Sequence, residues 1–164
     1  MQRRSALITT AVAALSGCGF QLRQSQPLPM RSIALVGFAP TSPLAAALRL
    51  ELERAGLALR DNPAQAETVF DALQDAREKT VAASTAFGQV REVQLRVRLR
   101  FRVATPNGKL LLPAAELLLT RDMSYSENLA LAKEYEEAQL YKAMQSDIVA
   151  QVMRRLSRVK LARS

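Results

Sequence analysis

Hydrophobic and polar residues alternate most regularly in the middle of the chain. Within residues 93–103 every second side chain is apolar and the ones between are polar or charged, which predicts a long strand with one buried face. Pro106-Asn107-Gly108 then predicts a tight turn, because Asn and Gly tolerate positive φ angles. Residues 109–125 would be the returning strand of a hairpin, with Pro113 marking a bulge or a sheet edge.

The chain before this hairpin predicts shorter elements. Residues 32–38 form an apolar run of strand length. Ser42 and Pro43 then favour a helix start, since serine caps helices and proline fits the first turn. Leu44, Leu48 and Leu52 would form its buried stripe, and a glycine at position 56 would end it.

The remaining segments complete a mixed pattern. Residues 66–74 favour a second strand, although their imperfect alternation and Ala-rich flanks leave a helix open. Residues 80–88 favour a mobile crossover between strands. From about residue 128 to residue 158, apolar side chains recur every fourth position and predict a long helix. The predicted class is therefore α+β: a four-stranded, mainly antiparallel sheet with two helices packed on one face, in the order β-α-β-β-β-α.

The first eighteen residues predict export and lipidation. Arg3 and Arg4 precede a short apolar stretch, residues 5–15, which falls short of the roughly 20 apolar residues that span a bilayer. Leu15-Ser16-Gly17-Cys18 follows and is typical of a lipobox. We therefore expect a signal peptide at residues 1–17, a lipidated N-terminus and tether at 18–30, and one domain at 31–164. Cys18 would carry a diacylglycerol and an N-acyl chain such as palmitate, and several acyl chains anchor a protein stably.

Composition restricts the chemistry of the exported domain. The chain has one cysteine and no histidine, so histidine-based catalytic and zinc sites are excluded, and an intramolecular disulfide is impossible. Carboxylates at Asp122, Glu127 and in the terminal helix could be imagined as the acid and base of a hydrolase, but no motif supports this. We expect no enzyme activity, no metal and no cofactor other than the covalent lipid.

The basic side chains of the alternating strand are the candidate binding site. The chain carries a formal charge of +8, and export makes nucleic acid an improbable partner. Three readings remain open for the row: a solvated outer face, a contact with glycolipid phosphates, and a contact with an acidic patch on a protein. Guanidinium groups bind phosphate with two hydrogen bonds. The candidate residues are Arg96, Arg98, Arg100, Arg102 and Lys109.

Three stretches together resemble the LptE family of lipopolysaccharide-assembly lipoproteins. They are residues 18–23 (CGFQLR), the basic strand leading to Asn107-Gly108, and the terminal helix that begins NLALAKE at residue 128 and reaches RRL at residue 156. The resemblance implies a non-enzymatic lipoprotein of the outer membrane, on its periplasmic side. It also implies that the protein plugs the LptD β-barrel, helps it assemble, and binds lipopolysaccharide at the last step of transport.

A second interpretation of the function stays open. An auxiliary periplasmic lipoprotein of another envelope lipid-transport system could share the lipobox and the α/β architecture. Recovery of a barrel partner with the protein would separate the two readings.

Overall fold

The structure is a computed structural model and describes residues 27–161. The predicted signal peptide and Cys18 lie outside these residues. The described elements, in chain order, are β1 (Ser32–Val36), α2 (Pro43–Arg54), β2 (Ala58–Leu59), the 3-10 turn η2 (Pro63–Gln65), β3 (Thr68–Ser84), β4 (Val90–Ala104), β5 (Leu110–Ser124), the 3-10 turn η3 (Glu127–Leu129) and α3 (Ala130–Leu156).

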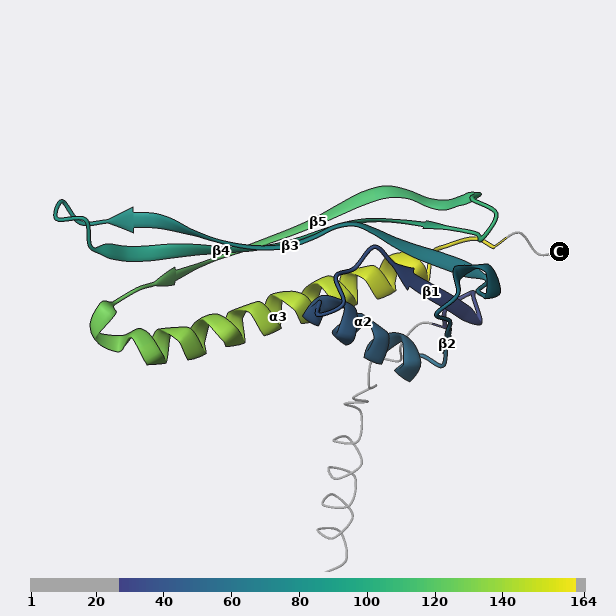
Figure 1. Cartoon of the computed structure of the whole chain (residues 1–164), viewed down its shortest axis with the longest axis horizontal. Coiled ribbons are helices and arrows are strands. Elements are labelled where there is room, and N and C mark those ends of the chain that lie inside the picture. The colour runs from purple at the N-terminus through teal and green to yellow at the C-terminus, as the bar shows by residue number, and fades with distance from the viewer. Residues whose placement is uncertain (1–26, 162–164) are drawn as a thin grey trace, which may run out of the picture.

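The strands form one mixed sheet whose two helices lie on the same face (Figure 1). The strand order is β2-β1-β3-β4-β5; β1 runs parallel to β2 and to β3, and the pairs β3-β4 and β4-β5 are antiparallel. The predicted α+β class is confirmed. The sheet has one strand more than predicted, because β2 is only two residues long and too short to show a hydrophobic period.

The core lies between the sheet and the helices. All six apolar side chains that alternate along β4 are buried, as are Leu44, Leu48 and Leu52 of α2 and the four-residue repeat of α3 from Met144 to Leu156. Phe101 of β4 stacks on Phe70 of β3 with ring centroids 4.7 Å apart. The helix α2 begins where predicted, since the Ser42 hydroxyl accepts a hydrogen bond from the Ala45 backbone N–H at 3.0 Å.

The prediction of a crossover at residues 80–88 was wrong. β3 continues to Ser84 and pairs with β4 along most of its length, so a tight turn at residues 85–89 joins two long strands. The distal part of β3 from Arg77 onward has only exposed residues. It therefore lacks the alternation by which a strand is recognised in a sequence.

Two special residues shape the strands. Pro113 lies in a register shift of β5, because Phe101 pairs with Ala115 while Val103 pairs with Leu112. β5 is also the last strand of the sheet, so the prediction of a bulge or an edge at Pro113 is confirmed. Gly37, directly after β1, has φ +81°, and a Cβ there would stand 2.2 Å from the Ala72 carbonyl oxygen.

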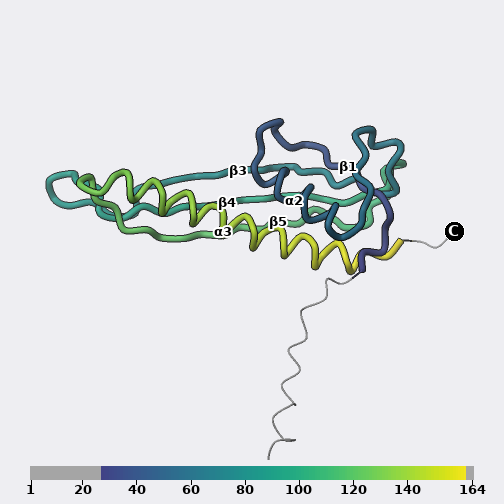
Figure 2. The backbone as a smooth tube through the Cα atoms, turned by 90° about the horizontal axis from the view of Figure 1, so that it is seen from below, coloured from purple at the N-terminus to yellow at the C-terminus, as the bar shows by residue number. Residues whose placement is uncertain are grey.

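The elements give the molecule two different ends (Figures 1 and 2). At the narrow end, the β3-β4 turn lies near η3 and the start of α3. At the wide end lie β1, β2, the β4-β5 turn and the C-terminal end of α3. Met30, which the sequence assigned to the tether, is buried in the core. None of the described helices is long and apolar enough to cross a membrane.

Candidate functional site

The candidate site is the face of the sheet that the helices leave uncovered (Figure 1). Both helices lie on the side of the buried β4 residues, so the intervening side chains point to the opposite side. Residues directly opposite each other on antiparallel strands share a face. We call the following set the outer face: Asp71, Gln74, Ala76, Glu78 and Thr80 of β3, Glu92, Gln94, Arg96, Arg98, Arg100 and Arg102 of β4, and Glu116, Leu118, Thr120, Asp122 and Ser124 of β5.

Arg102 and Arg98 are held by carboxylates of the neighbouring strands. The Arg102 Nε donates a hydrogen bond to the Asp71 carboxylate at 2.8 Å, and its Nη2 lies 2.8 Å from the same oxygen. The Arg98 Nη1 lies 3.6 Å from the Glu116 carboxylate on β5. Its Nε is buried and has no hydrogen-bond partner among the described residues. These two guanidinium groups are therefore already paired within the sheet.

Arg96 is held by a short relay along the same face. Its Nε donates to the Gln94 side-chain oxygen at 2.8 Å, and the Gln94 amide donates to the Asp122 carboxylate at 2.9 Å. Gln94 thus connects a guanidinium on β4 to a carboxylate on β5. The relay fixes the direction of the Arg96 side chain and leaves the other N–H groups of its guanidinium available to bind further acceptors.

Arg100 and Lys109 are the least engaged of the candidates. Arg100 is exposed and, within residues 27–161, has no hydrogen bond or ion pair from its side chain. Lys109 lies outside the row, in the β4-β5 turn, where its backbone N–H bonds the Thr105 hydroxyl and its ammonium group is likewise unpaired within the described chain. The structure therefore brings four of the five candidates into one row and places Lys109 beyond its wide end.

The outer face is charged but not net positive. Its four arginines are matched by five carboxylates, Asp71, Glu78, Glu92, Glu116 and Asp122. The sequence showed the arginines as an uninterrupted row, whereas the carboxylates come from three strands and gather only when the strands pair. A face of alternating charge suits a polar protein surface, while an exposed, unpaired guanidinium can still bind a phosphate.

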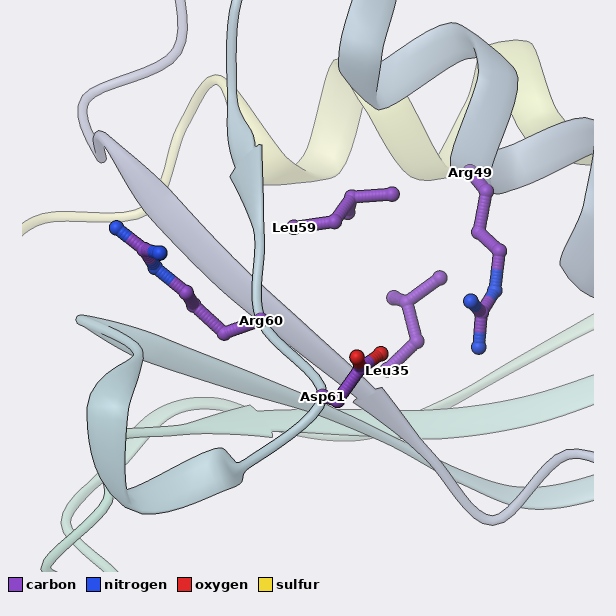
Figure 3. Close-up of a pocket in the computed structure, with 5 residues that line it drawn as sticks. All are labelled: Leu35, Arg49, Leu59, Arg60 and Asp61. Carbon is purple, nitrogen blue, oxygen red and sulfur yellow. The ribbon is translucent and has the colours of Figure 1, made fainter.

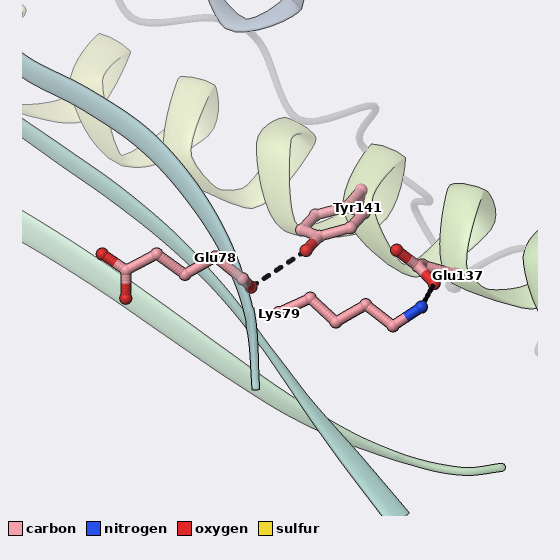
Figure 4. A network of polar contacts seen from close by, with 4 residues as sticks. All are labelled: Glu78, Lys79, Glu137 and Tyr141. Atoms are coloured by element: carbon pink, nitrogen blue, oxygen red, sulfur yellow. Dashed lines mark hydrogen bonds and ion pairs between the residues drawn. The ribbon is translucent and has the colours of Figure 1, made fainter. Parts of the chain in front are cut away.

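A second polar network, which the sequence did not reveal, ties the distal part of β3 to α3 (Figure 4). The Lys79 ammonium donates to the Glu137 carboxylate at 2.6 Å, and the Tyr141 hydroxyl donates to the Glu78 carbonyl oxygen at 2.9 Å. The Arg77 guanidinium carbon lies 5.0 Å from the Tyr141 ring centroid, within range of a cation–π contact. These polar contacts join strand and helix where no buried apolar residue of β3 does so.

Two pKa shifts follow from this network. The hydrogen bond to Glu137 raises the pKa of Lys79, because it favours the charged ammonium. Burial raises the pKa of Tyr141, because the phenolate would lose its hydration. Both groups therefore hold their protons more tightly in the folded chain than in the unfolded chain.

Two pockets on the described surface are small. One, of about 60 Å³, is lined by Leu35, Arg49, Leu59, Arg60 and Asp61 near the short strand β2 (Figure 3). The other, of about 130 Å³, lies between the start of β4 and η3. Sites for drug-sized ligands usually enclose about 300 to 1,000 Å³. The outer face, rather than either pocket, has the area to receive a large partner.

A protein-family model matches most of the chain. The family model described as "LptE: Lipopolysaccharide-assembly" matches residues 30–156. A curated relative, the LPS-assembly lipoprotein LptE of Photorhabdus laumondii subsp. laumondii, is 24% identical over 154 residues, which cover 92% of this chain and 82% of the relative. The matched range contains every helix and strand of the described residues.

Solved structures share the fold. The solution NMR structure of an uncharacterized lipoprotein B from Nitrosomonas europaea is 29% identical, with a TM-score of 0.70 over 85% of this chain and 90% of that one. A minor lipoprotein from Acinetobacter baumannii is 21% identical, with a TM-score of 0.66 over 84% of this chain and 100% of that one. The rare lipoprotein B from Shewanella oneidensis is 22% identical, with a TM-score of 0.63 over 77% of this chain and 93% of that one. The latter two show a common architecture alone.

Proposed function

Because this chain belongs to the LptE family of lipopolysaccharide-assembly lipoproteins, we propose that it plugs an LptD-like β-barrel and helps that barrel to assemble. In this proposal the protein is held by acyl chains on Cys18 at the periplasmic side of the outer membrane. It binds lipopolysaccharide during the last step of its transport to the cell surface, and it does so without catalysing a reaction. The family match over residues 30–156 is the observation that carries the proposal.

The outer face supports the barrel partner. Barrel lumens of outer-membrane proteins are polar, and charged groups of both signs can pair across such an interface. The four arginines and five carboxylates of the outer face offer both signs on a sheet surface free of helices.

Arg100 and Lys109 are the candidates best placed for a phosphate of lipopolysaccharide. Arg96, Arg98 and Arg102 already have polar partners within the sheet, so a phosphate would have to compete for them. The Arg100 and Lys109 side chains have no such partner within residues 27–161. We therefore assign glycolipid binding first to these two residues, and partner pairing to the other three.

Affinity purification of the tagged full chain from outer membranes tests the proposal. We expect a β-barrel protein in near-stoichiometric amount, identified by mass spectrometry, together with lipopolysaccharide. Recovery of the protein alone, under conditions that preserve other barrel complexes, would contradict the barrel role and favour the auxiliary transport lipoprotein.

Charge variants separate the two parts of the proposal. We expect Arg100→Gln combined with Lys109→Gln to lower the recovered lipopolysaccharide several-fold while the barrel is retained. Arg98→Glu should instead lower barrel recovery, because it reverses a charge of the outer face that is assigned to pairing with the barrel and leaves Glu116 without its cation. Arg49→Gln, an exposed change on α2, is the matched control and should alter neither.

A further inference from the structure

Charge is distributed unevenly between the two ends of the domain. Residues 77–92 and 120–143, which form the narrow end, carry six basic and seven acidic side chains. The rest of the described chain carries thirteen basic and eight acidic side chains. The net positive charge of the described domain therefore lies entirely outside the narrow end.

The densest part of this charge follows the last turns of α3. Residues 148–161 include Arg154, Arg155, Arg158 and Lys160 and no acidic residue. Arg155 is half-buried, with its guanidinium carbon 5.9 Å from the Phe101 ring centroid. Arg154, Arg158 and Lys160 are exposed, and their side chains have no ion pair within residues 27–161. Complementing the helix dipole requires cations only within the last turn, and Lys160 lies beyond it.

The beginning of the described chain lies at the same end. The purple segment that leads into β1 and the C-terminal end of α3 are both at the wide end, as the two views agree (Figures 1 and 2). Arg31, just before β1, is exposed, and its side chain is also without an ion pair in the described part of the chain. We call Arg31, Arg154, Arg158 and Lys160 the anchor-side cluster.

The length of chain before the domain limits how far the cluster can be from the anchor. Met30, which is buried in the core, comes twelve positions after Cys18 in the sequence. Twelve residues reach at most about 43 Å when fully extended. A lipid on Cys18 would therefore hold the wide end within this distance of the bilayer, and the narrow end, at the far side of the sheet, faces away from the point of attachment.

We propose that the anchor-side cluster rests on anionic phospholipid headgroups of the same leaflet that holds the acyl chains of Cys18. This inference depends on the lipid anchor of the proposed function and adds an orientation to it. Each basic residue near an anionic bilayer favours the bound state by about fivefold, so four together can orient a domain that is already tethered. Before a barrel takes it up, the domain would then stand with its wide end on the membrane and its narrow end away from it.

Energy transfer from the protein to labelled lipid headgroups tests this orientation. The full lipidated chain is reconstituted into phosphatidylcholine vesicles with and without phosphatidylglycerol, with a donor dye on Ala58→Cys or on Ala86→Cys. Residue 58 adjoins the cluster, since its backbone N–H bonds the Arg31 carbonyl at 2.9 Å, while residue 86 lies in the exposed β3-β4 turn. Both positions are exposed, and the Cys18 thiol is unavailable to the dye when it carries the lipid.

We expect phosphatidylglycerol to increase transfer from residue 58 at least twofold and to leave residue 86 nearly unchanged. Salt should reverse the increase, because surface charge interactions are screened within about 8 Å at physiological ionic strength. Arg154→Gln with Arg158→Gln should abolish it without releasing the protein from the vesicles. The matched control, Arg91→Gln with Lys142→Gln, removes two exposed charges from the narrow end and should retain it.

Three outcomes would overturn the inference. Equal transfer from residue 58 with and without phosphatidylglycerol would reject the orientation while the anchor stands. An increase that requires lipopolysaccharide in the vesicles instead of phosphatidylglycerol would assign the cluster to the glycolipid. A chain that fails to float with the vesicles would reject the anchor and the orientation together, whereas barrel recovery tests the plug role separately.

Discussion

The wide and narrow ends of the molecule hold the same sheet to the same helix by different means. At the wide end, aromatic and aliphatic side chains fill the space between the sheet and both helices, with Phe70 and Phe101 fully buried. Toward the narrow end, the distal part of β3 reaches α3 through Lys79, Tyr141 and their partners. Apolar burial sets the stability of the whole domain, whereas a few polar contacts set only the position of one strand.

Phe101→Ala should produce the largest loss, because it empties the centre of the wide-end core. We expect the free energy of unfolding to fall by about 3 to 5 kcal/mol, measured by chemical denaturation. Phe87→Ala is the matched control at the narrow end, where Phe87 is 94% exposed, and it should change the free energy by less than about 0.5 kcal/mol. Similar decreases in the free energy of unfolding of the two variants would contradict the conclusion that the wide end sets the stability of the domain.

Tyr141→Phe should have a smaller and local effect. It removes the hydrogen bond to the Glu78 carbonyl oxygen and keeps the ring beneath Arg77, a change worth about 0.5 to 1.5 kcal/mol. Hydrogen exchange should become faster in residues 77–84 and stay the same in β1. Tyr135→Phe, at an exposed ring, is the control. Faster exchange throughout the sheet would show that the two ends are not separable in this way.

Alkaline pH should weaken the contacts between the distal part of β3 and α3, and this effect should be the smallest of the three. Lys79 and Tyr141 both have a raised pKa in the folded chain, so their contribution is complete below the unfolded values of about 10 and is lost as pH rises through the folded values. The Lys79 side chain is 42% exposed, and solvent screening keeps the effect below about 1 kcal/mol.

Proteolysis between about pH 8 and pH 11 measures this loosening, with cleavage after residues 77–84 as the readout. Lys79→Met combined with Tyr141→Phe should remove most of the dependence on pH in that segment. A dependence that persists in the double variant would assign the loosening to other groups.

How far the fold could be predicted depended on burial. β4, α2 and α3 were predicted with nearly the observed bounds, because one face of each is buried and leaves a hydrophobic period. The distal part of β3 buries nothing, so its Ala, Ser and Thr residues suggested a loop. β2 is held by two backbone pairings to β1, and backbone pairing has no signature in side-chain type.

The candidate site was predictable only in part for a related reason. The alternation of β4 placed the four arginines on one face, because all of them belong to one strand. Their carboxylate partners Asp71 and Glu116 lie 31 residues before Arg102 and 18 residues after Arg98. Which of them meet depends on the register between strands, and the bulges at Ala72/Gln74 and around Pro113 shift that register. Local patterns do not encode such shifts.

The bulge at Pro113 also bears on how copies of this protein behave toward one another. β5 is a fifteen-residue strand at the margin of the sheet, and its sequence is rich in leucine, a combination that invites a second molecule to extend the sheet. Pro113 has no backbone N–H to donate to an added strand. The register shift beside it divides the unpaired backbone groups of the β5 edge into two shorter runs. Pairing of β5 with the same strand of a second copy is therefore disfavoured.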